Sequence, residues 1–394
     1  MVLDSENEAK VSINPDTSGL IGQLAARAQH HIHCVKKVRG HLERLGTVND
    51  KMRVRLWADL AKVARKEEVW DVCRAACRFC LLYDDGRWKM SYPSKGKGKT
   101  TEDSCATKLS SGTSHQQNRA CAFERDLIRL FVDVSFINGE ATIALLNKED
   151  IQYNNRPIPP DDKSKHPKGY VAPNPEENPE WIQYRDWIDS LSQYATKNFL
   201  RGAELGVELK DPLIVCNAAV YLWNCNHHLL IAGRYRELVD TFQSLLDAMK
   251  QTGHLGETIL LVMLCNALAQ GLIQPWIPNP VDNIEKKVSD KVPTESKRKK
   301  SLAKRTEKPS APQILSVEPE GIPYVNKALE VCEYAISITN RTEYTNTVPI
   351  AVRHHILITW VRVKQLLQQQ VGSKLGIEDE GKASKDFEPS KVSR

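Results

Sequence analysis

The stretch from Pro212 to Lys250 constrains the fold of this 394-residue chain more than any other. Apolar residues recur at helical spacing on both sides of Ala232-Gly233-Arg234-Tyr235, so that each side can form one apolar helix face. Gly233 can end the first helix, because a residue without a Cβ atom enters the left-handed region at little cost. Neither helix can bury its apolar stripe alone, so we predict a helical hairpin with a further face left for a neighbour.

A recurrent spacing of small and apolar residues extends this prediction to the rest of the chain. In four otherwise dissimilar segments, a small or apolar residue is followed four positions later by an apolar residue. Another small or apolar residue follows three positions after that. The spacing, and the aromatic residue at two of the joints, resembles the tetratricopeptide repeat, whose helix axes approach closely at the small positions. We therefore predict an all-α, helical-hairpin (tetratricopeptide-like) repeat solenoid with disordered insertions. The residues expected to pack the repeat cores are Trp57, Leu60, Ala61, Trp70, Cys73, Cys77, Cys80, Ala195, Phe199, Gly202, Tyr235, Leu238, Phe242, Leu245, Ala328, Cys332 and Ala335.

Polar, proline-rich and charged segments separate the predicted helices. Such segments cannot bury enough apolar surface to offset the cost of ordering the chain. The expected organisation is a disordered N-terminus (1–18), helical repeats (19–83), a disordered insertion (84–118), helical repeats (119–273) with a proline-rich insertion (149–179), a basic disordered insertion (274–320), helical repeats (321–370) and a disordered tail (371–394).

Composition favours a cytoplasmic protein without a membrane anchor. Hydrophobic residues make up 41% of the chain and charged residues 26%. No apolar segment resembling a secretory signal follows Met1. The most apolar run, Thr258 to Ile273, is shorter than the roughly 20 residues that a membrane span needs. Without a secretory signal, the 10 cysteines are expected to be reduced thiols.

The cysteines Cys73, Cys77 and Cys80 have the spacing with which radical enzymes hold an iron–sulfur cluster. That chemistry needs the thiolates to converge from a loop after a strand. Here the cysteines lie inside an apolar helical pattern, which would place them in a row rather than around a metal. We interpret them as core residues and predict no metal and no cofactor.

A second motif, Gly98-Lys99-Thr100, resembles the end of a phosphate-binding loop. No apolar strand precedes it and no helical pattern follows, as that loop requires. A Lys- and Gly-rich linker explains it better. We find no Ser or Cys nucleophile with a placed base, so the sequence predicts no enzyme.

The run from Lys286 to Lys308 contains ten Lys or Arg against three acids. Its net charge of +7 exceeds the +6 of the whole chain. Such a run is either a solvated linker or an electrostatic tether to a polyanion such as an acidic tubulin tail. No sequence-specific nucleic acid is expected as a partner. The candidate contacts to a polyanion or microtubule are Lys297, Arg298, Lys299, Lys300, Lys304 and Arg305.

Several strings of this chain resemble one family closely: Arg55 to Arg65 with the helix that follows it as far as Leu82, Pro179 to Tyr184, Tyr194 to Leu209, Asn217 to His228 and Gly271 to Pro278. The family is the large cilia- and flagella-associated protein also called tetratricopeptide repeat protein forty. Its members are much longer, so this chain resembles an internal portion, a splice form or a truncated gene model.

The resemblance implies a structural part of the axonemal central apparatus that is needed for cilium motility. It also implies a location in the cytoplasm, in the cytoskeleton of the cilium axoneme. Other central-apparatus proteins are the implied partners, with microtubules as a further candidate. The family brings no catalytic residues. The main hypothesis from the sequence is therefore a non-enzymatic axonemal scaffold.

Two rival functions stay open. One is a soluble tetratricopeptide-type adaptor that binds peptide tails. The usual clamp needs Lys and Asn where this chain offers Ala58 and Lys62, or Trp223 and His227, with Asn224 as a partial match. The other is an iron–sulfur or nucleotide-binding enzyme, which would need the cysteine or Gly-Lys-Thr motifs to act as ligands.

Overall fold

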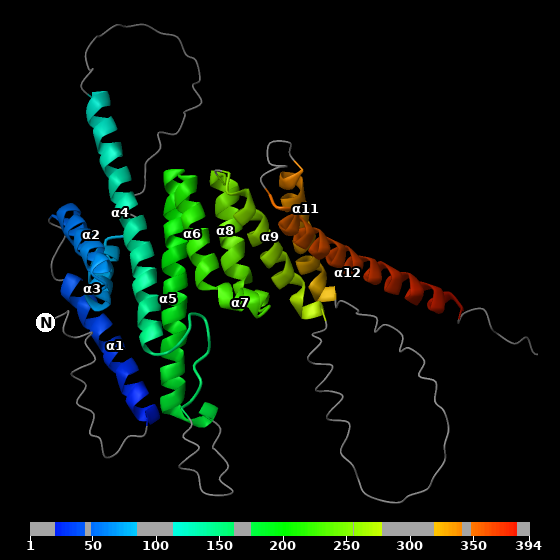
Figure 1. Cartoon of the computed structure of the whole chain (residues 1–394), viewed down its shortest axis with the longest axis horizontal. Helices are drawn as coiled ribbons and strands as arrows, with labels where there is room; N and C mark the ends of the chain where they lie inside the picture. The colour runs from blue at the N-terminus through cyan, green and yellow to red at the C-terminus, as the bar shows by residue number, and fades with distance from the viewer. Residues whose placement is uncertain are drawn as a thin grey trace, which may run out of the picture. The chain divides into compact units, whose positions relative to one another are not determined.

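The computed structural model describes residues 20–43, 49–84, 113–160, 175–254, 256–277, 319–340 and 348–383 (Figure 1). Every regular element in these ranges is a helix, which confirms the predicted all-α class. The chain divides into two compact units. The first lies within residues 1–227 and 247–255, and the second within 228–246 and 256–394.

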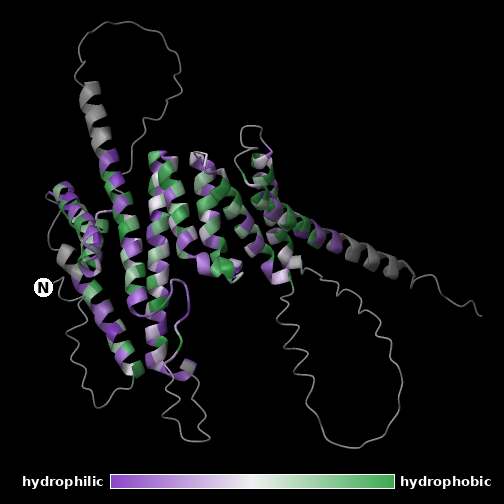
Figure 2. Cartoon of the chain, viewed as in Figure 1, coloured by the Kyte–Doolittle hydropathy of each residue, from purple (hydrophilic) through white to green (hydrophobic). Residues whose placement is uncertain are grey.

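The first unit is built around two long helices that run side by side, α4 and α5 (Figure 1). Helix α1 contacts α5, the α2–α3 pair contacts α4, and α6 contacts α5. Figure 2 shows apolar and polar residues interspersed along α4 and α5, as expected of helices that bury one face. The elements are α1 (Leu20–Glu43), α2 (Asp50–Lys66), α3 (Trp70–Leu81), α4 (Thr113–Lys148), the 3₁₀ turn η4 (Pro175–Glu177), α5 (Pro179–Leu209) and α6 (Pro212–Cys225).

Helices α2 and α3 form a tight hairpin whose facing residues are small. The side chains of Ala58 and Ala61 on α2 are completely buried. On α3, the Cys73 thiol donates to the Ala61 carbonyl (3.6 Å) and the Cys80 thiol donates to the Val54 carbonyl (3.6 Å). Sulfur-to-backbone contacts of this kind require the two helix axes to approach closely, as the sequence spacing predicted.

Helices α4 and α5 each carry a phenylalanine ring that packs against a glycine of the other helix. A Cβ atom at Gly202 of α5 would lie 2.3 Å from the Phe136 ring of α4. A Cβ atom at Gly139 of α4 would lie 2.6 Å from the Phe199 ring of α5. Each ring therefore occupies the space that a side chain would take on the facing helix. This reciprocal packing sets the distance between the two central helices.

Helix α5 begins with a capped turn and continues into an aromatic core. The Asn178 side chain accepts hydrogen bonds from the backbone N–H groups of Glu180 and Trp181. This satisfies donors that have no partner within the helix. Trp181 and Trp187 are both buried, in a cluster that includes residues of α1, α4 and α5.

The second unit centres on α9, which contacts η5, α11 and α12. A Cβ atom at Gly271 of α9 would lie 2.6 Å from the Tyr235 carbonyl oxygen, so the backbones of α9 and η5 approach closely there. Its elements are most of α7 (His227–Ile231), η5 (Tyr235–Leu238), the start of α8 (Val239–Thr252), α9 (Thr258–Ile273), η6 (Gln274–Trp276), η7 (Pro319–Gly321), α11 (Ile322–Thr339) and α12 (Ile350–Ala383).

Two described stretches, Arg125–Lys148 and Thr258–Trp276, are long and apolar enough to span a membrane by composition alone. Most residues of both stretches are buried within the protein. Burial in a helical core accounts for their high hydropathy.

The predicted hairpin joint is partly right and partly wrong. Gly233 has a φ of +70°, in the left-handed region, as predicted. The preceding helix is not continuous, however, because α6 ends at Cys225 and α7 begins at His227. Asn226 lies at the break and is 1% exposed. Its side-chain amide donates to the Leu222 carbonyl (2.8 Å) and accepts from Asn154 (2.6 Å). A buried side chain that bonds the backbone competes with helix continuation.

Two other boundary predictions differ from the structure. Residues 113–118, expected in a disordered insertion, form the start of α4. They contain no glycine or proline, so nothing in them interrupts the helix that follows. Residues 371–383, expected in a disordered tail, continue α12 and contain no proline.

Candidate functional site

The candidate sites named from the sequence fall into two groups. The basic run with Lys297–Lys300, Lys304 and Arg305 lies outside the described residues, as does Gly98-Lys99-Thr100. The residues expected to pack the repeat cores are all described. Thirteen of these seventeen are buried, and the half-buried ones are Trp57, Leu60, Trp70 and Tyr235.

The three helical cysteines are completely buried, with no exposed side-chain area at Cys73, Cys77 or Cys80. The hydrogen bond with Cys73, together with burial, raises the pKa of the Cys77 thiol well above its usual value. Burial raises the pKa of Cys80 to about 12. The same hydrogen bond with Cys77 lowers the pKa of Cys73. Because a metal ligand must be a thiolate, Cys77 and Cys80 are poorly suited to bind iron or zinc. Within the described ranges, no group of three or more His, Cys, Asp or Glu residues is placed to hold a metal ion.

Replacing Cys73, Cys77 and Cys80 together by Ala should lower the free energy of unfolding by only about 0.5–1 kcal/mol per residue, through lost packing. The metal content of the purified protein should not change. The check is elemental analysis beside urea unfolding of both proteins. Stoichiometric iron or zinc that disappears in the triple variant would contradict a core role.

A groove of about 690 Å³ lies in the first unit among α1, α3, α4 and α5. We call it the basic groove. Its walls are apolar and its rim carries cations. The apolar wall residues are Ile32, Val35, Leu81, Leu82, Trp187 and Leu191, and the rim cations are Lys36, Arg78, Lys197 and Arg201.

Asp84 is the one carboxylate among the residues that line the groove. The Arg201 guanidinium donates two hydrogen bonds to the Asp84 carboxylate, from Nε to Oδ2 (2.7 Å) and from Nη2 to Oδ1 (2.8 Å). These hydrogen bonds raise the pKa of Arg201. Lys36 and Lys197 are exposed to solvent. Arg201 also pairs with Glu204 (2.9 Å) and lies 3.9 Å from Glu208, so the positive charge that the rim presents to solvent is that of Lys36 and Lys197.

One end of the groove is rich in hydrogen-bond donors around His31. The Nη2 atoms of Arg74 and Arg78 each lie 2.9 Å from His31 Nε2, and the Trp187 indole N–H donates to Nδ1 (3.1 Å). Burial, with the charges of the two arginines, lowers the pKa of His31 to about 2. His31 is therefore neutral at physiological pH. A neutral imidazole accepts at one nitrogen and donates at the other.

The buried polar residues Ser135 and Asn198 line the floor of the groove. Asn138 donates to the Tyr194 hydroxyl (2.8 Å) and to Asn198 Oδ1 (3.0 Å), which links α4 to α5. Next to them lies Ser135, which is completely buried. Its hydroxyl has no hydrogen-bond partner among the described residues. Leaving a buried hydroxyl without a partner costs roughly 1–3 kcal/mol.

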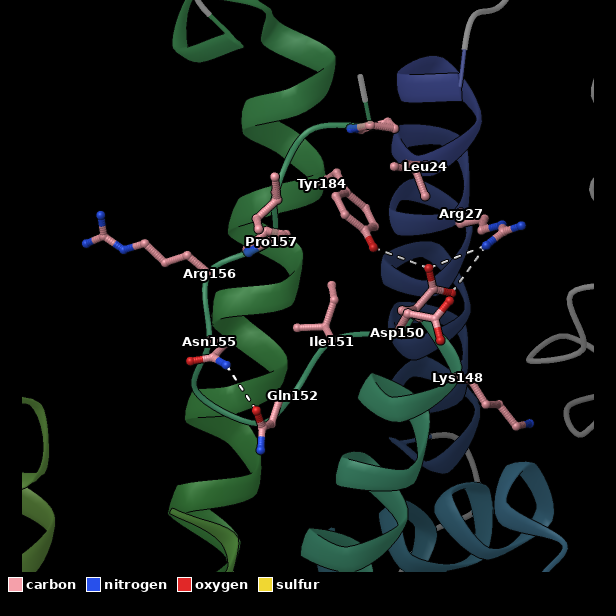
Figure 3. Close-up of a pocket in the computed structure, with 13 residues that line it drawn as sticks. Leu24, Arg27, Lys148, Asp150, Ile151, Gln152, Asn155, Arg156, Pro157 and Tyr184 are labelled. Carbon is pink, nitrogen blue, oxygen red and sulfur yellow. Dashed lines mark hydrogen bonds and ion pairs between the residues drawn. The ribbon is translucent and has the colours of Figure 1, made fainter. Parts of the chain in front are cut away.

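A second cavity of about 580 Å³ lies where α4 ends (Figure 3). The Glu149 side chain, 3% exposed, accepts hydrogen bonds from Tyr184 Oη (3.3 Å) and Arg27 Nη1 (3.4 Å). Burial and the neighbouring Glu149 charge raise the pKa of Tyr184. Glu149 thus joins the end of α4 to α1 and α5, which is a structural use of the carboxylate.

No protein-family model matches the chain, and no solved structure matches it. The family resemblance therefore rests on the shared strings alone.

The sequence reasoning missed the basic groove. A partial signal was present, because Arg74 and Arg78 on α3, and Lys197 and Arg201 on α5, are spaced four residues apart and share a helix face. Nothing in the sequence indicated that the two faces would meet.

Proposed function

We propose that the protein is a non-enzymatic structural scaffold of the ciliary and flagellar axoneme. In this proposal it belongs to the central apparatus and supports cilium movement through contacts with other proteins there. The observation that carries the proposal is the place of the shared strings in the fold. The string Arg55 to Arg65 lies on α2, Tyr194 to Leu209 on α5, and Asn217 to Cys225 on α6. Their inward residues pack helices together, which is what a scaffold requires.

The proposal includes a helical-hairpin repeat solenoid. Consecutive helices contact each other in both units: α2 with α3, α5 with α6, and α11 with α12. The four predicted sets of small and apolar residues, beginning at Cys73, Ala195, Leu238 and Ala328, are all buried. Elements that contact their neighbours along the chain are typical of repeat arrays.

A soluble adaptor for peptide tails is the second candidate, and the basic groove favours it. The groove combines apolar walls with a cationic rim, which are the features of a peptide-binding surface. It lies among α1, α3, α4 and α5, whereas the usual tetratricopeptide clamp would involve Ala58 and Lys62 on α2.

Cross-linking mass spectrometry on intact axonemes separates the two candidates. A scaffold should remain with the axoneme after detergent extraction and should cross-link to central-apparatus proteins. An adaptor should be recovered in the detergent-soluble fraction, and that result would argue against the axonemal proposal.

The basic run contributes a separate prediction about attachment to microtubules. Replacing Lys297, Arg298, Lys299, Lys300, Lys304 and Arg305 by Gln removes six of its ten positive charges. The attraction to a carboxylate-rich surface is screened over about 8–10 Å at physiological salt, so the loss of binding should be greatest at low salt. Co-sedimentation with microtubules across a salt series measures this effect, with circular dichroism as the control for helicity. Equal binding by the two proteins at every salt concentration would make the run a plain linker.

A further inference from the structure

We propose that the basic groove binds a segment of a partner protein that carries a bulky apolar side chain among acidic residues. The inference rests on the proposed protein-binding function, as scaffold or as adaptor, and names a class of partner for it. Three observations support it: the apolar walls, the charge of the rim, and an unpartnered hydroxyl on the floor.

The walls fit an apolar side chain. A volume of about 690 Å³ lies within the range of roughly 300–1,000 Å³ that is usual for ligand pockets. Leu81, Leu191 and Trp187 line it, and at its edge Ile32 is 41% exposed and Leu82 is 36% exposed. Covering large apolar groups that are exposed at a concave surface removes apolar area from water, which favours binding.

The rim selects acidic residues around that side chain. Its four cations come from three helices, Lys36 on α1, Arg78 on α3, and Lys197 and Arg201 on α5. Arg201 is already paired with Asp84 and Glu204, so the charges that face a ligand are mainly those of the exposed Lys36 and Lys197. Cations distributed around an apolar centre complement several carboxylates along a peptide.

The floor supplies an independent sign of a ligand. The Ser135 hydroxyl is completely buried, lines the groove and has no partner among the described residues. A helical serine commonly bonds the carbonyl four residues earlier, but this one does not. A backbone carbonyl or N–H of a bound segment would satisfy it and remove the cost of leaving it unpartnered.

Selection from a displayed library of random peptides on the intact chain tests the proposal. The enriched peptides should carry acidic residues on both sides of a Leu, Phe or Trp. A synthetic copy of the most enriched peptide is then titrated by fluorescence anisotropy. Lys36→Glu with Lys197→Glu should weaken its binding by about tenfold at low salt, because attraction becomes repulsion at two exposed positions.

Lys66→Glu with Lys327→Glu is the matched control. Both lysines are exposed, neither lines the groove, and the change in net charge is the same. This variant should bind the peptide as the unmodified chain does. A general effect of net charge would instead weaken both variants equally, which would contradict the proposal.

Ser135→Ala provides a second, independent readout. In the free chain it should leave the thermal unfolding midpoint unchanged or raise it, because it removes an unpartnered polar group. The same change should weaken peptide binding by about three- to tenfold, the value of one hydrogen bond.

The inference is overturned if no peptide is enriched, or if the enriched peptides bind the Lys36→Glu, Lys197→Glu variant as well as the unmodified chain. Neither outcome depends on where the protein resides in the cell. Failure of the groove proposal is therefore distinguishable from failure of the axonemal proposal, which localisation tests.

Discussion

Replacing Gly202 by Leu should lower the free energy of unfolding by about 3 kcal/mol or more, the upper part of the range for overpacked cores. On helix propensity alone, exchanging this glycine for Leu would stabilise α5 by up to about 1 kcal/mol. Packing decides the outcome, because a Cβ atom at Gly202 would lie 2.3 Å from the Phe136 ring. Phe136 is buried and contacts the rings of Phe199 and Tyr221, so it has little room to move. Urea unfolding followed by circular dichroism measures the change.

The double variant Gly202→Leu, Phe136→Ala is the control for this mechanism. Removing the ring frees the space that the new side chain needs, so the double variant should lose less stability than the sum of the two single changes. Additive losses would show that Gly202 matters for a reason other than its contact with Phe136. The same test applies to Gly139 and Phe199, the reciprocal pair on the two helices.

The second large effect is a decrease in the free energy of unfolding in mild acid, which we expect because of His31. Its pKa is lowered to about 2 by burial and by the Arg74 and Arg78 charges. The unfolded chain therefore binds a proton at His31 below about pH 6.5, whereas the folded chain does not. The contribution of His31 to the free energy of unfolding is therefore fully present above pH 6.5, and it decreases as the pH falls below 6.5. The slope is about 1.4 kcal/mol per pH unit, or roughly 2–3 kcal/mol between pH 6.5 and 4.5.

His31→Gln removes the titrating group and keeps a side-chain acceptor for the arginines. Its free energy of unfolding should depend less steeply on pH between 6.5 and 4.5 than that of the unmodified chain. Urea unfolding at a series of pH values measures both curves. The account of His31 is wrong if the two curves run parallel, or if nuclear magnetic resonance shows His31 titrating near pH 6.5 in the folded protein.

Helical periodicity predicted the class of fold, and residue size predicted where helices approach. Cys73 and Gly202 were named as small positions from spacing alone, and both lie at close helix contacts. These features are local, because a helix face and its small residues are set by neighbours within a few turns. The partner of each small residue, such as Phe136 for Gly202, was not predictable, since it lies on another helix.

The break at Asn226 shows why boundaries are harder to predict. The sequence around it is apolar and favours one helix, yet the Asn226 side chain bonds Asn154, which lies 72 positions away in the chain. The basic groove could not be predicted from the sequence for the same reason. Its lining residues extend from His31 to Arg201 along the chain and meet only when four helices pack. Local sequence patterns do not indicate which helices pack against each other.

The most direct test of the axonemal proposal is the position of the protein in a motile cilium. The chain, fused to a small protein tag that adds density, would be expressed in ciliated cells and its axonemes imaged by cryo-electron tomography. We predict added density on a projection of the central microtubule pair, and no added density on the outer doublets. Density on the outer doublets alone, or a tagged chain that is absent from the axoneme and recovered in the soluble fraction, would contradict the proposal.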